Sequence, residues 1–161
     1  MWLWLLLAQL AFAAPEMIPE EDTNLVGRTA PEIEAPMIGG DFRLSDHRGK
    51  PVVLSFWASW CGPCRQELPA LDELQKSRPD IAVFAVNVDR EKGKAMNFLK
   101  QVKIDLPVVW DHDSIALGAY QVLSMPTVIV VDGKGTVKLV KVGFSRERKL
   151  SEIEAVLKEI Q

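Results

Sequence analysis

The sequence has few of the residues that bind metals: its 161 residues include two cysteines and two histidines. A structural zinc site usually takes four Cys or His ligands, and its histidines stand three to five residues apart. His47 and His112 lie far from each other in two predicted loops, and no third cysteine accompanies Cys61 and Cys64. We therefore expect no metal site, with His47 on a surface loop and His112 facing solvent or lying beside a helix cap.

The two cysteines are too close together to act mainly as a structural crosslink. Only two residues separate Cys61 from Cys64. A disulfide stabilises a protein largely by restricting its unfolded chain, and the effect grows with the length of the closed loop. A bridge across two residues restricts little, so the pair is better explained by chemistry than by stability.

The chain has no excess of positive charge and no internal repeats. It carries 19 basic and 22 acidic residues, a formal net charge of −3. Domains that bind nucleic acids normally present a basic face, so the composition argues against that class of partner. Hydrophobic residues make up 48% and charged residues 25%. This is an ordinary balance for a folded domain, and the length suits one domain.

No apolar run is long enough to span a membrane. Residues 2–12 are apolar except for Gln9, whereas a spanning helix needs about 20 residues. The run has the length of a signal-peptide core, and Ala11 and Ala13 are the small residues that a signal peptidase recognises. We expect residues 1–13 to be a signal peptide cleaved after Ala13, although no Lys or Arg precedes the run. A short uncleaved anchor and a buried core helix are the alternatives.

The rest of the chain divides into a linker and one domain. Residues 14–29 are acidic and contain proline, which predicts a linker, and the folded domain is expected over residues 30–161. In that domain, continuous apolar runs rich in β-branched residues predict strands buried on both faces. The expected strands are 51–58, 81–88, 106–110, 126–131 and 136–142, with a β-hairpin over 33–44.

Apolar residues at helical spacing predict the helices. Leu68, Leu71 and Leu74 form the apolar face of the first helix, which follows Cys64, and Pro69 should kink it. The other helices are expected over 92–102, 114–120 and 146–160. Strands and helices alternate before a final hairpin and helix, which predicts an α/β three-layer sandwich with a mixed central sheet.

The segment Cys61-Gly62-Pro63-Cys64 lies between a predicted strand and a predicted helix. Free backbone N–H groups and the positive end of the helix dipole stabilise an anion there, so a thiolate at Cys61 is favoured. Lowering a thiol pKa from about 8.5 to about 7 raises the thiolate fraction at pH 7 from roughly 3% to about half. Cys64, one turn later, can attack a mixed disulfide at Cys61 and release the bound partner. Pro63 fits an early helical position, where no N–H partner is lost.

Longer stretches around this motif resemble a known family. FWASWCGPCRQELPAL, preceded by RLSDHRGKPVVLS and followed later by AYQVLSMPTVIVVDGKG, resembles the TlpA/ResA family of membrane-linked, thioredoxin-like reductases. The resemblance runs from about residue 30 to residue 161. It implies a thioredoxin-like fold with an added βα insertion between Asp89 and Gly118, and it implies thiol–disulfide exchange with no cofactor.

The resemblance also assigns roles around the two cysteines. Cys61 and Cys64 would form a redox-active disulfide, supported by Gly62 and Pro63 between them. Trp60 would shield Cys61 and offer client proteins an apolar contact.

The segment at Met125 and Pro126 is also interpreted through the resemblance, whereas Trp57 and Glu67 are interpreted from their places in the predicted strand and helix. The Met125–Pro126 peptide bond matches the position at which this fold carries a cis-proline opposite the cysteines. A cis bond there would leave the Met125 backbone free to pair with an extended client segment. Trp57 is expected in the core, and Glu67 is expected on a solvated helix face.

The chain departs from the family pattern at the proton acceptor. Plain thioredoxins carry a buried Asp on the strand before the motif, and Ser55 stands there in this chain. Some relatives carry a buried Glu in the insertion, and Arg90, between Asp89 and Glu91, stands at the matching position of this chain. The acid–base helper of Cys64 therefore stays open, with a water molecule or a shifted carboxylate as the candidates.

The Cys-Gly-Pro-Cys sequence predicts a reductant. Thioredoxin, with the same central dipeptide, has a potential of about −270 mV, whereas strong oxidants of this fold lie at about −120 mV. By the same resemblance, we expect a periplasmic protein, soluble or tethered by its N-terminal segment. Its electrons would come from a transmembrane thiol transporter, and its clients would be thiols or disulfides of an apocytochrome c or of a copper-site protein.

Two other functions remain open at this point. The cysteine pair could hold Cu(I) with help from the soft methionine sulfur atoms, although each methionine is better explained as core, linker or turn. The methionines concerned are Met17, Met37, Met96 and Met125. A thiol peroxidase of related fold would need a Thr-x-x-Cys loop, which the residues before Cys61 do not provide.

Overall fold

A mixed sheet organises the part of the chain that the computed structural model describes, which is residues 24–161 apart from the side chains of 146–148. Within it, seven strands lie in the order β2-β1-β5-β4-β3-β6-β7. The strands are β1 (Glu34–Met37), β2 (Gly40–Arg43), β3 (Val52–Trp57), β4 (Ala82–Asn87), β5 (Val108–Trp110), β6 (Thr127–Val131) and β7 (Val137–Val142). The helices are α1 (Cys64–Ser77), α2 (Lys92–Val102), α3 (Ile115–Ala119), α4 (Arg146–Glu159) and a 3₁₀ helix over Leu44–His47.

Strand directions confirm the mixed sheet predicted from the sequence. β3, β4 and β5 run parallel to one another. β6 is antiparallel to β3, and β7 is antiparallel to β6. The hairpin of β1 and β2 adds to the edge of β5. The segment between Asp89 and Gly118 supplies α2 and β5, and β5 fills the position between the hairpin and β4.

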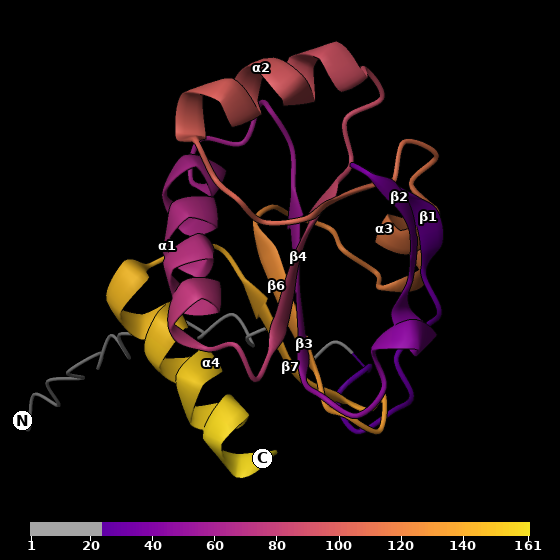
Figure 1. Ribbon diagram of the computed structural model, residues 1–161, viewed down its shortest axis with the longest axis vertical. Coiled ribbons are helices and arrows are strands. Elements are labelled where there is room, and N and C mark those ends of the chain that lie inside the picture. Colours follow the sequence, from indigo (N-terminus) through magenta and orange to yellow (C-terminus); the bar gives the residue numbers. More distant parts are fainter. Residues whose placement is uncertain (1–23) are drawn as a thin grey trace, which may run out of the picture.

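The central strands are apolar along their whole length because both faces of the sheet are covered. Figure 1 shows α1 and α4 side by side on one face and α3 on the other. On β3, Val53 and Trp57 pack towards the first face, whereas Leu54 and Phe56 pack towards the second. Every residue of β3 and β4 is buried, which confirms the interpretation of these continuous apolar runs.

The folded part of the chain begins before residue 30. Leu25 is buried, and the backbone N–H of Gly27 donates to the carbonyl of Val137 on β7. Thr29 then forms a β-bridge with Thr136. The expected linker over 14–29 therefore extends too far, because residues 24–27 form a turn that packs on the domain and residues 27–29 bond to the backbone at the start of β7. The expected signal peptide over 1–13 and the first part of that linker lie outside the described residues.

His47 does not lie on a surface loop as expected. It ends the 3₁₀ helix, is half-buried and stacks on Phe42, with its ring 4.7 Å from that of Phe84. Burial lowers the pKa of His47 below the ordinary value. Its role in the described fold is to close one end of the core beneath the hairpin.

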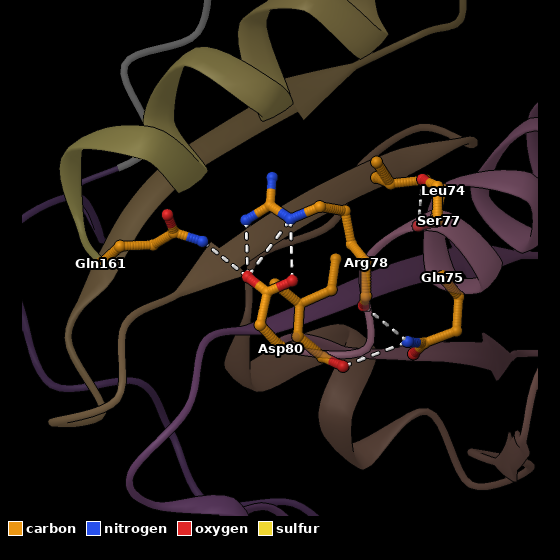
Figure 2. A network of polar contacts seen from close by, with 7 residues as sticks. Leu74, Gln75, Ser77, Arg78, Asp80 and Gln161 are labelled. Atoms are coloured by element: carbon orange, nitrogen blue, oxygen red, sulfur yellow. Dashed lines mark hydrogen bonds and ion pairs between the residues drawn. The ribbon is translucent and has the colours of Figure 1, made fainter.

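The end of α1 is tied to the end of the chain (Figure 2). Arg78 forms an ion pair with Asp80 over 2.7 Å, and the side-chain amide of Gln161 donates to the same carboxylate. The hydrogen bonds from Arg78 lower the pKa of Asp80 to about 2. The Gln75 side chain donates to the carbonyl of Ile81, which fixes the turn that leads into β4.

In residues 24–161, no helix is long and apolar enough to cross a membrane.

A substitution at the end of α2 tests this description of the fold. Lys103 has a φ of 53° in the left-handed region, and its N–H donates to the carbonyl of Leu99. Because a side chain is disfavoured there and glycine is not, Lys103→Gly should raise the free energy of unfolding by about 0.5–1 kcal/mol. Lys100→Gly, inside the same helix, should lower it by about 1 kcal/mol. Urea unfolding of both variants gives the comparison, and equal losses of stability would show that α2 does not end at this residue.

Candidate active site

The structure joins Cys61 and Cys64 in a disulfide between the end of β3 and the start of α1. Both cysteines are buried, with 3% and 0% of their surface exposed. Gly62 and Pro63 between them are exposed. The bridge is therefore reached from the side of the turn, while the rest of its surroundings is core.

The helix after the bridge presents a hydrogen-bond donor to the first sulfur. The backbone N–H of Cys64 donates to Sγ of Cys61 over 3.3 Å. α1 begins at Cys64, so Cys61 lies just before the first helical turn instead of inside it. Free N–H groups at a helix start favour an anion. A sulfur atom at this position is therefore placed to carry negative charge.

The loop before β6 has an uncommon backbone conformation and contributes to the apolar cluster that contains the disulfide. The Met125–Pro126 peptide bond is cis. Met125 is half-buried and packs against the apolar cluster that contains both cysteines. Pro126 is buried, and its carbonyl accepts a hydrogen bond from Gly143 over 2.8 Å.

Two tryptophans near the motif have different environments. Trp60 is 71% exposed, next to Cys61 in the sequence. Trp57 is fully buried, as expected for a core residue, and lies 4.9 Å from the ring of Phe98. An exposed indole thus directly precedes the buried cysteine pair in the chain.

Glu67 is not on a solvated helix face, and the expectation to that effect was wrong. Its side chain is buried, with 1% of the residue exposed. Oε1 accepts a hydrogen bond from the hydroxyl of Ser55 over 2.6 Å, and Oε2 pairs with Nζ of Lys149 at 2.5 Å. Burial raises the pKa of Glu67 even though Lys149 opposes the shift. Since Glu67 follows Cys64 by three residues on α1, the two side chains share one helix face.

The partner of Glu67 was not found by sequence reasoning. Lys149 on α4 is 2% exposed, and burial lowers its pKa against the pull of Glu67. A signal was present: Lys149 precedes Ile153 by four residues and Leu157 by eight, so it lies on the buried face of its helix. Glu67 stands beside Leu68 on the apolar face of α1 in the same way. A charge on each of two apolar faces is the pattern of a buried pair.

The carboxylates suggested in the insertion are committed to other contacts. Asp89 is buried and accepts hydrogen bonds from the backbone N–H and the hydroxyl of Ser59, each at 2.8 Å. It therefore holds the turn that leads into Cys61. Glu91 is exposed and pairs with Lys94. His112 is half-buried, with Nδ1 2.6 Å from the backbone oxygen of Asp89. It does not face open solvent, and it lies two residues before Ser114, the N-cap of α3, which agrees with the expected place beside a helix cap.

The described residues do not assemble a metal centre. In residues 24–161, no group of three or more His, Cys, Asp or Glu side chains is placed to hold an ion. Met37 lies on β1 and packs against the other apolar cluster, whereas Met96 on α2 and Met125 in the loop before β6 both pack against the cluster that contains the cysteines. Met17 lies outside the described residues.

Comparison with known proteins agrees with this geometry. Residues 26–140 match the model of the AhpC/TSA family. The thiol–disulfide oxidoreductase ResA of Geobacillus thermodenitrificans is 35% identical over 145 residues, which cover 88% of this chain and 83% of the relative.

Solved structures give the same result. A Chlorobium tepidum protein assigned as the thiol:disulfide interchange protein DsbE has a TM-score of 0.77 and 39% identity, and the match covers 82% of this chain and 97% of that one. The exposed lipoprotein thioredoxin Etrx1 of Streptococcus pneumoniae has a TM-score of 0.67 and 33% identity, and covers 78% and 99% of the two chains. The thioredoxin-like fold and the TlpA/ResA resemblance are thereby confirmed. Because the family model, the related sequences and the solved structures agree with the cysteine pair at the start of α1, the chain belongs to the AhpC/TSA family of thioredoxin-fold proteins, as a ResA-like thiol–disulfide oxidoreductase.

Proposed function

We propose that this protein is an exported reductant of protein disulfides, in which Cys61 attacks the client and Cys64 resolves the mixed disulfide. The observation that carries the proposal is the hydrogen bond from the Cys64 N–H to Sγ of Cys61 at the start of α1. The same N–H would stabilise a thiolate at Cys61 once the bridge is reduced.

The first step forms a mixed disulfide. The Cys61 thiolate attacks one sulfur of the client disulfide, a bond forms between the two sulfur atoms, and the other client sulfur leaves as a thiolate that takes a proton from water. In this proposal the exposed indole of Trp60 contacts the client, and the backbone at Met125, before the cis-proline, pairs with an extended client segment; the exposure of Trp60 and the packing of Met125 against the cysteine cluster support these roles.

The second step releases the client and needs a base. Cys64 gives its proton to the base and attacks Sγ of Cys61, the Cys61–Cys64 disulfide forms, and the client sulfur leaves as a thiolate that takes up a proton from water. Glu67 is the buried carboxylate three residues along the same helix, so we assign it the role of accepting the Cys64 proton, directly or through one water molecule. Its raised pKa suits a base, because a carboxylate with an ordinary pKa takes up a proton only weakly at neutral pH.

The relatives guide the proposed setting. One matched structure bears the name DsbE and another is an exposed lipoprotein. Together with the apolar N-terminal run, this supports a position on the periplasmic side of a bacterial membrane, soluble or tethered. The proposed electron donor is a transmembrane thiol transporter. The proposed clients are cysteines of an apocytochrome c awaiting haem, or of a copper-site protein.

The direction of electron flow is tested by the reduction potential. Equilibration of the Cys61–Cys64 pair with glutathione redox buffers should give a potential below about −200 mV. The reduced protein should also catalyse insulin reduction, with turnover lost in Cys61→Ser. A potential near −120 mV would mark an oxidant. Tight Cu(I) binding by the reduced pair without turnover would support the copper-handling alternative.

The client class is tested with a trapping variant. Cys64→Ser cannot resolve the mixed disulfide, so it should accumulate a covalent complex with the native client in exported extracts. Cys61→Ser is the matched control, because it lacks the attacking thiol and should form none. Mass spectrometry of the trapped partner then distinguishes an apocytochrome c from a copper-site protein, and equal trapping by both variants would contradict the assigned roles.

A further inference from the structure

The pair formed by Glu67 and Lys149 joins two elements that lie 82 residues apart in the sequence. Both side chains are almost fully buried, at 1% and 2% exposure, and their charged atoms are 2.5 Å apart. Burying a charge is costly unless it is paired and hydrogen-bonded. The two residues therefore depend on each other, and the proton-accepting capacity of one is set by the charge of the other.

The ammonium group of Lys149 also contacts the neighbouring strand. Nζ donates to the backbone carbonyl of Gly143, which follows β7. The N–H of Gly143 in turn donates to the carbonyl of Pro126. One lysine thus connects the carboxylate of Glu67, which lies one helical turn after Cys64, to the cis-proline loop before β6.

We propose that Lys149 is a positioning residue for disulfide exchange: its buried positive charge keeps the Glu67 carboxylate ionised and aimed along α1, so that Glu67 can accept the proton of Cys64. This inference rests on the function proposed above and on the role given there to Glu67. Nothing in the family resemblance assigned a function to this lysine.

The direction of the effect follows from electrostatics. A positive charge at hydrogen-bond distance favours the carboxylate form of Glu67, whereas burial alone favours the neutral acid. Without Lys149, Glu67 would hold its proton to higher pH and could not take the proton of Cys64 at neutrality. Ser55 would remain, but a single hydroxyl donor is weaker than an ammonium group.

Other charges near the pair do not replace Lys149. Lys141 on β7 and Glu152 on α4 act on Lys149 in opposite senses and pair with each other at 2.8 Å. Ser55 on β3 adds a neutral hydroxyl. Among the described residues, Lys149 is the positive group in contact with the Glu67 carboxylate, and Cys64 is the titrating thiol on the same face of α1.

The test measures the resolving step by itself. Reduced protein is mixed with an aromatic disulfide such as dithiobis(nitrobenzoate), and release of the coloured thiol is followed by stopped flow. The first phase reports attack by Cys61 and depends on reagent concentration. The second phase reports attack by Cys64 within the mixed disulfide and does not. Its rate is measured as a function of pH.

Lys149→Met should move the midpoint of the second-phase pH profile upwards by about one unit or more and slow this phase about tenfold at pH 7. The rate of the first phase should change by less than about threefold, because the thiolate of Cys61 is stabilised by the start of α1 and not by Glu67. Lys149→Gln, which keeps hydrogen-bonding capacity but has no charge, should give the same shift. Lys149→Arg, which keeps the charge, should restore the profile. Lys158→Met, an exposed change of the same charge on α4, is the control and should leave both phases unchanged.

A double variant separates this role from simple loss of packing. In the Glu67→Gln background, the second phase is already slow, and adding Lys149→Met should change it little, because the lysine acts through Glu67. The inference is overturned if Lys149→Met leaves the second-phase midpoint unchanged, if Lys149→Arg fails to restore it, or if the two substitutions slow the step additively. Absence of the first phase in the unmodified protein would instead refute the proposed function, so the two failures are distinguishable.

Discussion

Stabilisation of one negative charge, on Sγ of Cys61, is the constraint on which the rest of the site depends. The donor is the backbone N–H of Cys64 at the start of α1, and a backbone donor keeps its position when the sulfur atoms change partners. β3 delivers the cysteine from the centre of the sheet, and Asp89 holds the turn at Ser59 just before it. The sheet thus serves chiefly to fix the position of one sulfur atom relative to one helix.

A second charged feature of the site is the buried ion pair of Glu67 and Lys149, whose carboxylate lies one helical turn after Cys64. The Glu67–Lys149 pair joins α1 to α4 in the interior of the protein. A buried ion pair stabilises a fold little more than apolar residues of similar size would. Its presence there is more easily understood as part of the chemistry than as a contribution to the core. In the proposed mechanism the two cysteines therefore have different supports: the start of α1 for the attacking sulfur, and the buried carboxylate of Glu67 for the resolving one.

Sequence patterns predicted most of the fold and the reactive pair, because both depend on local signals. Apolar runs predicted β3 and β4. The Cys-Gly-Pro-Cys motif predicted the reactive cysteine pair, because the two cysteines and the start of the helix are encoded within a few neighbouring residues. Glu67 was placed in solvent because a charged residue on a helix is usually exposed. Its burial depends on Lys149, which the fold brings to it from the far end of the chain. The start of the domain was misplaced for a similar reason, because residues 27–29 bond to the backbone at the start of β7.

The pKa of Cys61 in the reduced protein tests the account most directly. The rate of Cys61 alkylation by iodoacetamide, followed residue by residue with mass spectrometry across a pH series, reports the thiolate fraction. The account predicts a midpoint near pH 7, well below the value of about 8.5 for a free thiol. A midpoint at or above that value would show that the start of α1 does not ionise this sulfur, and the assigned order of attack and resolution would lose its physical basis.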